Sequence, residues 1–261
     1  MKEPKIAVSN DIGDGPDLLR FVQCYQFAAI DWSFRKIENL PFESLKRQPF
    51  VNWIKNQNGI DIRYHCPIPE MELAHANHDL TQQALENYKT LIQIVSQVGG
   101  RFFTVHIGIG QPASDLLCWK TAIENLSRLV EFGGKYAVTV CLENLLTGWT
   151  SQPDRFKELI GRSGAGVTFD IGHAYSCEAV QTGKFTCSDF IDSIKDRVFN
   201  AHIYHSEEPG LGHLPPRTLD DIMPRLELLM DTKCDWWVIE LTNASETLHT
   251  KSLLQDFLTT R

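Results

Sequence analysis

The segment GVTFDIGH, residues 166–173, is a short apolar run that stops at Asp170 and is followed by His173. Seven further runs rich in β-branched or aromatic residues recur along the chain. Together the eight are Lys5–Ser9, Phe27–Trp32, Ile60–His65, Phe102–Ile107, Val138–Leu142, Gly166–Ile171, Val198–Ile203 and Trp236–Leu241. Their nearly continuous apolar character is typical of parallel strands that are buried on both faces.

Segments with helical periodicity lie between these runs. Apolar residues follow three- and four-residue spacing in Leu80–Val98, Leu116–Val130, Leu219–Met230 and Glu246–Leu258. The glycine pairs at 99–100 and 133–134 predict the C-terminal ends of the first two helices. The Ser-x-x-Asp motif at 151–154, with Pro153 early in the turn, predicts the start of another helix.

Strands that alternate with helices at intervals of about 33 residues match the size of a (β/α)8 barrel. We therefore predict an α/β fold, a single TIM barrel that spans residues 1–261 as one domain, because no stretch has the composition of a linker. A doubly wound open sheet would also alternate, but it usually has fewer strands and a glycine-rich first turn. The first turn here, 10–15, has Gly13 and Gly15 but no third glycine.

The amino-acid composition argues against some classes of binding partner. Hydrophobic residues make up 43% of the chain and charged residues 22%, as in globular proteins, and the net charge is −8. A surface this acidic counts against nucleic acid or an anionic membrane as the main partner. No apolar stretch reaches 18 residues, the first residues do not resemble a secretory signal, and the seven cysteines do not form a disulfide framework. We expect a cytoplasmic protein; a homo-oligomer is compatible with the sequence, which does not determine the oligomeric state.

Ionisable residues stand where most of the predicted strands end, which is where TIM barrels carry their active sites. These residues are His65, His106, Glu143, Asp170 with the nearby His173, His202, and Glu240. An ionisable side chain that closes an apolar strand is partly buried, which costs several kcal/mol unless it is paired or bound to a metal.

Each of these residues has an ordinary structural explanation when it is taken alone. A strand-end carboxylate can cap the next helix or pair with an arginine, and His65 or His106 can be a core histidine bonded to the backbone. The group of Glu143, Asp170, His202 and Glu240 is harder to explain in that way, because only Arg63 offers a cation near these strand ends. Crowded carboxylates repel each other, and one divalent metal ion (Mn, Mg, Co or Zn) would relieve that repulsion.

At these residues the chain resembles the xylose-isomerase-like barrel superfamily, which includes sugar isomerases, ketose 3-epimerases, inosose dehydratases and zinc-dependent apurinic-site endonucleases. The resemblance covers the whole chain and is carried by CLEN at 141–144, FDIGH at 169–173, AHI at 201–203 and VIEL at 238–241. It implies that Glu143, Asp170, His202 and Glu240 are metal ligands. It also implies that His65, His106 and His173 contact substrate hydroxyls or, in the endonuclease branch, hold additional zinc ions.

The segment GLGHLPP, residues 210–216, resembles the family segment that follows the seventh strand and contains His213. Three departures from the family pattern matter. Leu211 stands where the endonucleases place an aspartate that helps to hold a third zinc ion. Arg217 and Thr218 replace expected glycines, and the stretch 204–209 lacks the arginine of the ketose epimerases.

The expected function is that of a divalent-metal-dependent isomerase or epimerase that acts on a small sugar or keto-polyol. Glu143 and Glu240 would be the catalytic acid and base for proton transfer through an enediolate, and His65, His106, His173 and His213 would bind the substrate. Three alternatives stay open: an inosose-type dehydratase, a zinc-dependent endonuclease-like phosphodiesterase, and a barrel that binds a small polar ligand without turning it over. The loop 241–245 lacks a glycine-rich phosphate turn, which favours a substrate without a phosphate group.

Overall fold

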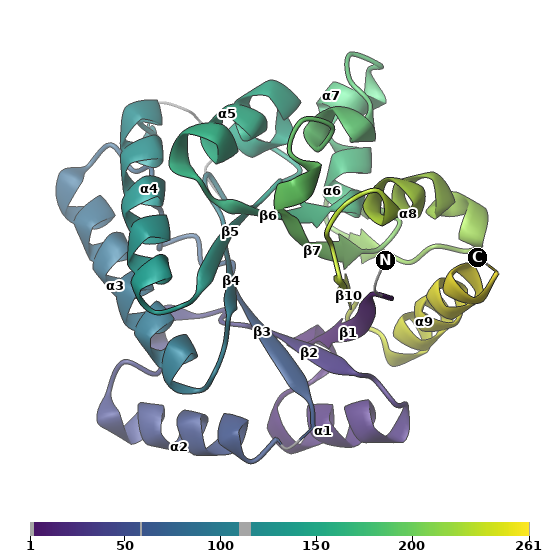
Figure 1. The fold of residues 1–261 in the computed structure, drawn as a ribbon, viewed down its shortest axis with the longest axis horizontal. Coiled ribbons are helices and arrows are strands. Elements are labelled where there is room, and N and C mark those ends of the chain that lie inside the picture. Colours follow the sequence, from purple (N-terminus) through teal and green to yellow (C-terminus); the bar gives the residue numbers. More distant parts are fainter. Residues whose placement is uncertain (1–2, 58, 110–115, 261) are drawn as a thin grey trace.

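The computed structural model of the protein describes residues 3–57, 59–109 and 116–260. Eight parallel strands close into a barrel in the order β1-β2-β3-β4-β5-β6-β7-β10, with β10 paired to β1 (Figure 1). They are β1 Lys5–Ser9, β2 Ala29–Ser33, β3 Asp61–Cys66, β4 Phe102–Val105, β5 Thr139–Glu143, β6 Gly166–Asp170, β7 Val198–Ile203 and β10 Trp236–Ile239. The predicted (β/α)8 barrel is therefore confirmed, and all eight predicted runs contribute a barrel strand.

Helices surround this barrel (Figure 1). They are α1 Gly15–Cys24, α2 Ser44–Lys55, α3 His78–Gln97, α4 Trp119–Lys135, α5 Pro153–Ser163, α6 Ile171–Ser176, α7 Glu178–Gln181, α8 Met223–Met230 and α9 Ala244–Thr259. The helix α3 shows why they pack: Leu85, Tyr88, Leu91, Ile92 and Val95 repeat at helical spacing and are buried. Within the described residues, no helix is both long and apolar enough to cross a bilayer.

Two sequence predictions about helix ends are wrong. The helix α4 does not stop at Gly133-Gly134 but continues to Lys135, because Gly133 has a packing role: a Cβ there would lie 2.6 Å from the Val138 carbonyl oxygen. The start predicted at Ser151–Asp154 is right for Pro153, which opens α5, but Ser151 does not cap it. The Ser151 hydroxyl instead donates to the Gly148 carbonyl oxygen at 2.9 Å.

A column of polar side chains fills the middle of the barrel. Asn200 donates to Thr168 Oγ1 at 3.1 Å, and the Thr104 and Thr168 hydroxyls lie 2.7 Å apart. Below them Arg63 donates to Asn200 Oδ1 and to the Phe199 carbonyl oxygen, and its guanidinium lies over the rings of Phe102 and Trp236. Hydrogen bonding satisfies these buried groups, so the barrel interior is a packed core that supports the side chains above it.

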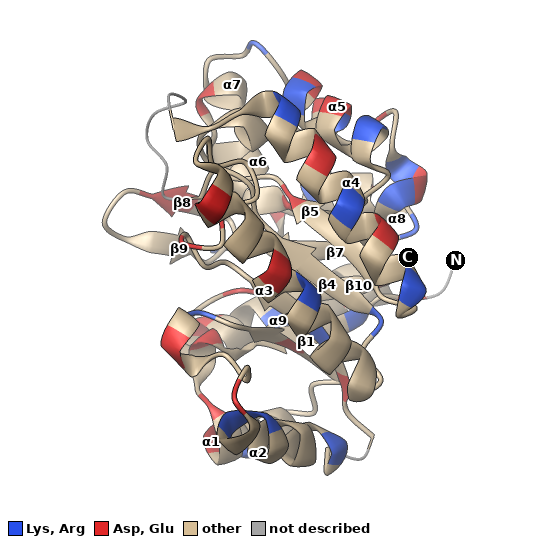
Figure 2. Cartoon of the chain, turned by 90° about the vertical axis from the view of Figure 1, so that its left-hand side faces the viewer, with Lys and Arg blue, Asp and Glu red and all other residues tan. Residues whose placement is uncertain are grey.

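A small antiparallel hairpin stands at the carboxyl-terminal mouth of the barrel. Its strands are β8 Ser206–Glu208 and β9 Gly212–Leu214, and the sequence analysis did not predict it. Figure 2 shows the hairpin projecting from the barrel on the side away from the N-terminus, with acidic residues on β8. The hairpin therefore adds side chains to the same end of the barrel as the strand-end carboxylates.

Candidate metal centre

Glu143, Asp170, His202 and Glu240 come together at the carboxyl-terminal mouth, as the sequence analysis predicted from their strand-end positions. We call them the quartet. One ligand atom from each lies within 4.8 Å of those of the other three, and all four side chains are buried. Nδ1 of His202 lies 2.9 Å from Glu240 Oε2, 3.2 Å from Glu143 Oε1 and 3.8 Å from Asp170 Oδ2. Three carboxylates thus surround one imidazole nitrogen.

Asp170 caps a helix, as the sequence analysis considered, and it does so with only one of its two carboxylate oxygens. Its Oδ1 accepts a hydrogen bond from the His173 amide at 2.7 Å and so caps α6. The Asn144 side chain fixes the backbone of Asp170 through two hydrogen bonds of 2.9 Å. The second carboxylate oxygen, Oδ2, is buried and accepts no hydrogen bond from the described residues. A buried oxygen held in this way is suited to a cation.

A second ligand group shares Glu143 with the quartet. It consists of His65, His106 and Glu143. The two Nε2 atoms of the histidines lie 2.8 Å apart, and they lie 3.3 Å (His65) and 3.1 Å (His106) from Glu143 Oε2. Because Oε1 of Glu143 faces the quartet and Oε2 faces the histidines, one carboxylate connects the two groups.

A third ligand group lies under the hairpin and consists of His173, Glu207 and His213. His173 Nε2 lies 2.8 Å from Glu207 Oε2, and the His213 ring stacks on Tyr204 at 3.9 Å between centroids. The sequence analysis missed Glu207, because this residue lies on a short polar hairpin rather than at the end of an apolar run. Leu211, where the endonuclease pattern has aspartate, is 68% exposed between β8 and β9, and the carboxylate of this group is that of Glu207.

The electrostatics of the quartet favour ionised carboxylates around a protonated or cation-bound imidazole. Burial alone would raise the pKa of Glu143, but His202, His106 and His65 lower it well below its usual range. Burial likewise opposes the charge on Glu240, and His202 outweighs it and lowers the pKa of that carboxyl. For His202 itself, burial disfavours the charge, whereas Glu143 and Glu240 raise the pKa well above its usual value.

The pKa values of Asp170, His65 and His173 are shifted in other directions. Burial raises the pKa of Asp170 to about 6, although His173 opposes the shift. Burial lowers the pKa of His65 to about 3, so this ring is neutral at pH 7 and keeps a lone pair. Burial would also lower the pKa of His173, but Asp170 and Glu207 raise it to about 10. His65 is therefore prepared to act as an uncharged ligand.

The residues present fit a divalent cation. The quartet offers three carboxylates and one imidazole, which is an oxygen-rich set that suits Mn, Mg, Co or Zn. Asp170 Oδ2 and His202 Nδ1 are buried without a hydrogen-bond partner among the described residues, as expected of atoms that face a metal ion. No lysine or arginine of the described chain forms an ion pair with any member of the quartet.

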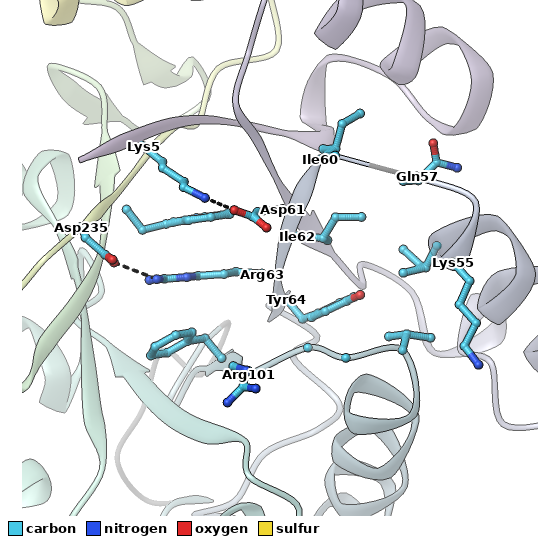
Figure 3. A pocket seen from close by; sticks show the side chains of 17 residues that line it. Lys5, Lys55, Gln57, Ile60, Asp61, Ile62, Arg63, Tyr64, Arg101 and Asp235 are labelled. Atoms are coloured by element: carbon cyan, nitrogen blue, oxygen red, sulfur yellow. Dashed lines mark hydrogen bonds and ion pairs between the residues drawn. The ribbon is translucent and has the colours of Figure 1, made fainter. Parts of the chain in front are cut away.

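A cavity of about 300 Å³ opens above the quartet and is large enough for a small polar molecule. Its lining includes His65, His106, His173, His213 and Glu207. A cavity of about 520 Å³ lies at the opposite end of the barrel (Figure 3), where Lys5 pairs with Asp61 and Arg63 pairs with Asp235. Its paired charges and its amino-terminal position indicate a stabilising role, since TIM barrels place their chemistry at the carboxyl-terminal end.

Asp31 is a further buried acid that the sequence analysis missed. It lies inside β2 and is 2% exposed, and with His65 and His202 it forms a group whose ligand atoms lie within 4.8 Å of one another. Burial, reinforced by the charges of Glu240 and Glu143, raises the pKa of its carboxyl to about 7, although His202 opposes the shift. An acid within an otherwise apolar run was the sequence signal that could have identified it.

Comparison with known proteins finds a family model, a relative in sequence and similar solved structures. A family model described as a xylose isomerase-like TIM barrel matches residues 21–244. An uncharacterized protein of Methanocaldococcus jannaschii is 32% identical over 206 residues, which is 78% of this chain and 83% of that protein. The structure of a D-tagatose 3-epimerase-like protein matches with a TM-score of 0.74 and 17% identity, covering 98% of this chain and 97% of that one. Endonuclease IV from Thermus thermophilus matches with a TM-score of 0.67 and 14% identity, covering 99% and 100%.

Proposed function

This chain belongs to the xylose isomerase-like TIM-barrel family, and from that premise we propose that it is a divalent-metal-dependent isomerase or epimerase of a small sugar or keto-polyol. The observation that carries the proposal is the quartet: three carboxylates and one imidazole from four strands meet around one point at the barrel mouth. The fold shared with a D-tagatose 3-epimerase-like protein supports a sugar-sized substrate in the cavity above them.

The proposed cofactor is one divalent ion held by Glu143, Asp170, His202 and Glu240. When bound, such an ion supplies Lewis acidity, which polarises a carbonyl oxygen and stabilises negative charge on the substrate. The protein's own contribution is the rigid placement of the four ligands at the ends of β5, β6, β7 and β10.

We assign the proton transfer to Glu143 and Glu240. Two strands, β6 and β7, separate β5 from β10 in the barrel, so the two carboxylates approach the cavity from different sides. Both have a lowered pKa and are ionised at neutral pH, which is the form that accepts a proton from carbon. Removal of a proton by one carboxylate, and delivery of a proton by the other after it has taken one up from solvent, gives epimerisation. Return of the removed proton by the first carboxylate to the adjacent carbon gives isomerisation.

The histidines that line the cavity would orient the substrate. His65 and His106 lie beside Glu143, and His213 lies beside Glu240, with its Nδ1 2.9 Å from the Glu240 carbonyl oxygen. These rings can donate or accept hydrogen bonds to hydroxyl groups. His173 is engaged with Glu207, so its assignment as a substrate ligand requires that this ion pair open.

The test combines metal analysis with isotope exchange. Purified protein should contain a divalent ion, and incubation with ketoses, aldoses, inososes or hydroxypyruvate in deuterated water should exchange one carbon-bound hydrogen of a substrate. Glu143→Gln and Glu240→Gln should each abolish exchange, while Glu131→Gln, on the exposed face of α4, should keep it. Full exchange in either site variant would remove that residue from the mechanism.

A second candidate function is a zinc-dependent phosphodiesterase of the endonuclease IV type. The observation in its favour is that three ligand groups lie side by side, with Glu207 completing the third. The net charge of −8 and the acidic β8 at the mouth (Figure 2) oppose binding of a DNA backbone. Zinc-dependent nicking of a duplex that contains an abasic site would establish this function in place of the first. A dehydratase is distinguished by loss of water from the substrate after the same proton abstraction.

A further inference from the structure

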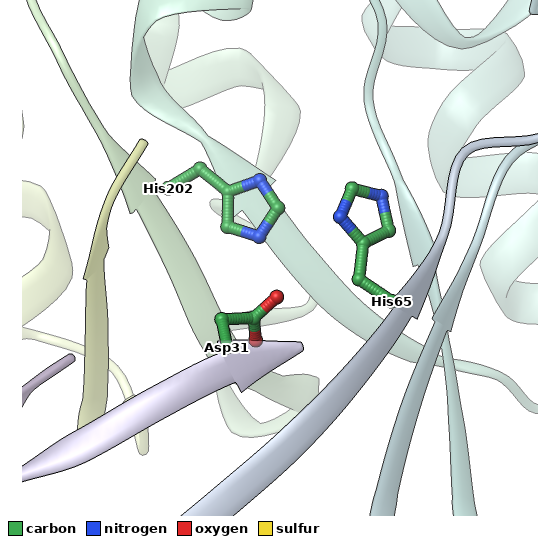
Figure 4. Close-up of side chains that lie close together, drawn as sticks. All are labelled: Asp31, His65 and His202. Carbon is green, nitrogen blue, oxygen red and sulfur yellow. The ribbon is translucent and has the colours of Figure 1, made fainter. Parts of the chain in front are cut away.

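Asp31 lies behind the quartet, on the side away from the cavity. Ser33, two residues later on β2, contacts His65 inside the barrel, and Asp31 shares that inward face because side chains alternate along a strand. Figure 4 shows the Asp31 carboxylate pointing toward the rings of His202 and His65. The two imidazole rings next to Asp31 belong to different ligand groups, and their hydrogen bonds show which of them lacks a partner.

His65 already has partners for both ring nitrogens. Its Nδ1 lies 3.1 Å from Ser33 Oγ, and its Nε2 lies 2.8 Å from His106 Nε2. His202 does not. Its Nδ1 faces Glu240 and Glu143, and its Nε2 faces Asp31 in Figure 4 and has no hydrogen-bond partner among the described residues.

Nε2 of His202 carries a proton in either state of the site. If a cation sits on Nδ1, the neutral ring must hold its proton on Nε2, and if the ring is charged, both nitrogens are protonated. The side chain is fully buried, and a buried N–H without an acceptor costs about 1–3 kcal/mol. An acceptor is therefore required, and it must lie on the inner side of the ring.

Asp31 is free to be that acceptor. Within the described part of the chain no ion pair or side-chain hydrogen bond holds its carboxylate, because the neighbouring Arg63 is bonded to Asn200, Phe199 and Asp235. The group that contains Asp31 and His202 keeps its ligand atoms within 4.8 Å of one another, a separation that one bridging water spans.

We propose that Asp31 is a positioning residue that accepts the Nε2 proton of His202 through one bridging water and thereby turns the Nδ1 lone pair toward the quartet. This inference rests on the proposed metal site. A carboxylate behind a metal-binding histidine fixes the ring and raises its basicity, and loss of such a partner weakens metal affinity by about 10–100-fold. Asp31 would thus strengthen the quartet without touching the cation or the substrate.

The test uses three variants and two readouts. Asp31→Ala removes the acceptor, Asp31→Asn keeps a neutral acceptor of the same shape, and Ser33→Ala is the matched control that removes the partner of His65 instead. The first readout is the Nε2–H resonance of His202 in ¹⁵N-histidine-labelled protein, assigned by its absence in His202→Asn. The second is the affinity of the quartet for Zn²⁺ or Mn²⁺, measured by competition with a chelator.

In the parent protein the His202 Nε2–H resonance should lie downfield, as for a buried N–H proton in a hydrogen bond. Asp31→Ala should move it upfield and weaken metal binding by about 10–100-fold, Asp31→Asn should do so by about tenfold or less, and Ser33→Ala should leave the resonance in place. An unchanged resonance together with unchanged affinity in Asp31→Ala would overturn the proposal. The resonance is recorded in metal-free protein as well, so a parent protein that binds no metal refutes the proposed function while the resonance still decides the role of Asp31.

Discussion

Asparagine at position 170 should separate metal binding from folding. Asp170→Asn keeps Oδ1, which accepts the His173 amide at 2.7 Å and caps α6. It replaces Oδ2, the buried oxygen without a hydrogen-bond partner, by an amide nitrogen. The variant therefore loses one ligand and one negative charge, while the local backbone keeps its hydrogen bonds.

Without metal, this variant should be more stable than the parent protein at pH 8. Burial raises the pKa of Asp170 to about 6, so ionising it in the folded state costs about 3 kcal/mol relative to an ordinary aspartate of pKa ~3.9. Because the folded-state pKa is raised, this cost is absent below about pH 4, grows between pH 4 and 6, and is complete above pH 6. For 261 residues, 3 kcal/mol corresponds to about 5 °C in Tm.

With metal the stability advantage of the variant should largely disappear. An ion at about 1,000 times its Kd stabilises the parent protein by about 4 kcal/mol, or about 7 °C in Tm. A loss of about 100-fold in affinity, expected for removal of one of four ligands, leaves about 1.4 kcal/mol, or about 3 °C.

Thermal unfolding at pH 8, with a chelator and with added Mn²⁺ or Zn²⁺, measures both effects. Asp154→Asn, an exposed aspartate at the start of α5, is the control and should change neither Tm. The reasoning fails if the ion raises the Tm of Asp170→Asn as much as that of the parent, or if the metal-free variant is the less stable protein.

Three further changes test other parts of the molecule. Arg63→Met should lower the stability by about 3 kcal/mol, seen as a fall of about 5 °C in Tm with metal affinity unchanged, because it leaves Asn200 and the Phe199 carbonyl without their donor. Gly172→Ala should cost about 3 kcal/mol in denaturant unfolding, since the new Cβ would lie 2.0 Å from Tyr204 Cε2; a loss under ~1 kcal/mol would contradict this packing. Glu207→Gln should lower the pKa of His173 from about 10 in an NMR titration, and an unchanged value would show that Asp170 and Glu143 raise it without Glu207.

The strand ends were predictable from sequence for a physical reason. A barrel strand is buried on both faces, so its sequence is a continuous apolar run, and an ionisable residue marks where that run ends. Closure of the barrel then brings all the carboxyl ends to one mouth. Glu143, Asp170, His202 and Glu240 could therefore be grouped without any knowledge of distances, although they are far apart along the chain.

The rest of the site could not be read in this way. Glu207 lies on a hairpin whose short polar strands carry no apolar signal, and its partner His173 comes from helix α6. Asp31 lies within a run that is buried on both faces, where no polar alternation tells which side chains point inward. The helix end at Gly133 was mispredicted for a similar reason. Gly133 packs against Val138 and against Val140 of β5, and rules for helix ends based on local sequence do not describe such contacts.

The two carboxylate oxygens of Glu143 face two different ligand groups, and this arrangement has a thermodynamic consequence. An ion held through Oε1 would orient the carboxylate and withdraw electron density from Oε2, so occupancy of the quartet would change the affinity of the His65–His106 group for a second ion. Linkage makes the effect reciprocal, with the same factor in both directions. Two ions bound at these positions would therefore be coupled, and a change at this one residue would alter the cooperativity of loading as well as the strength of each site.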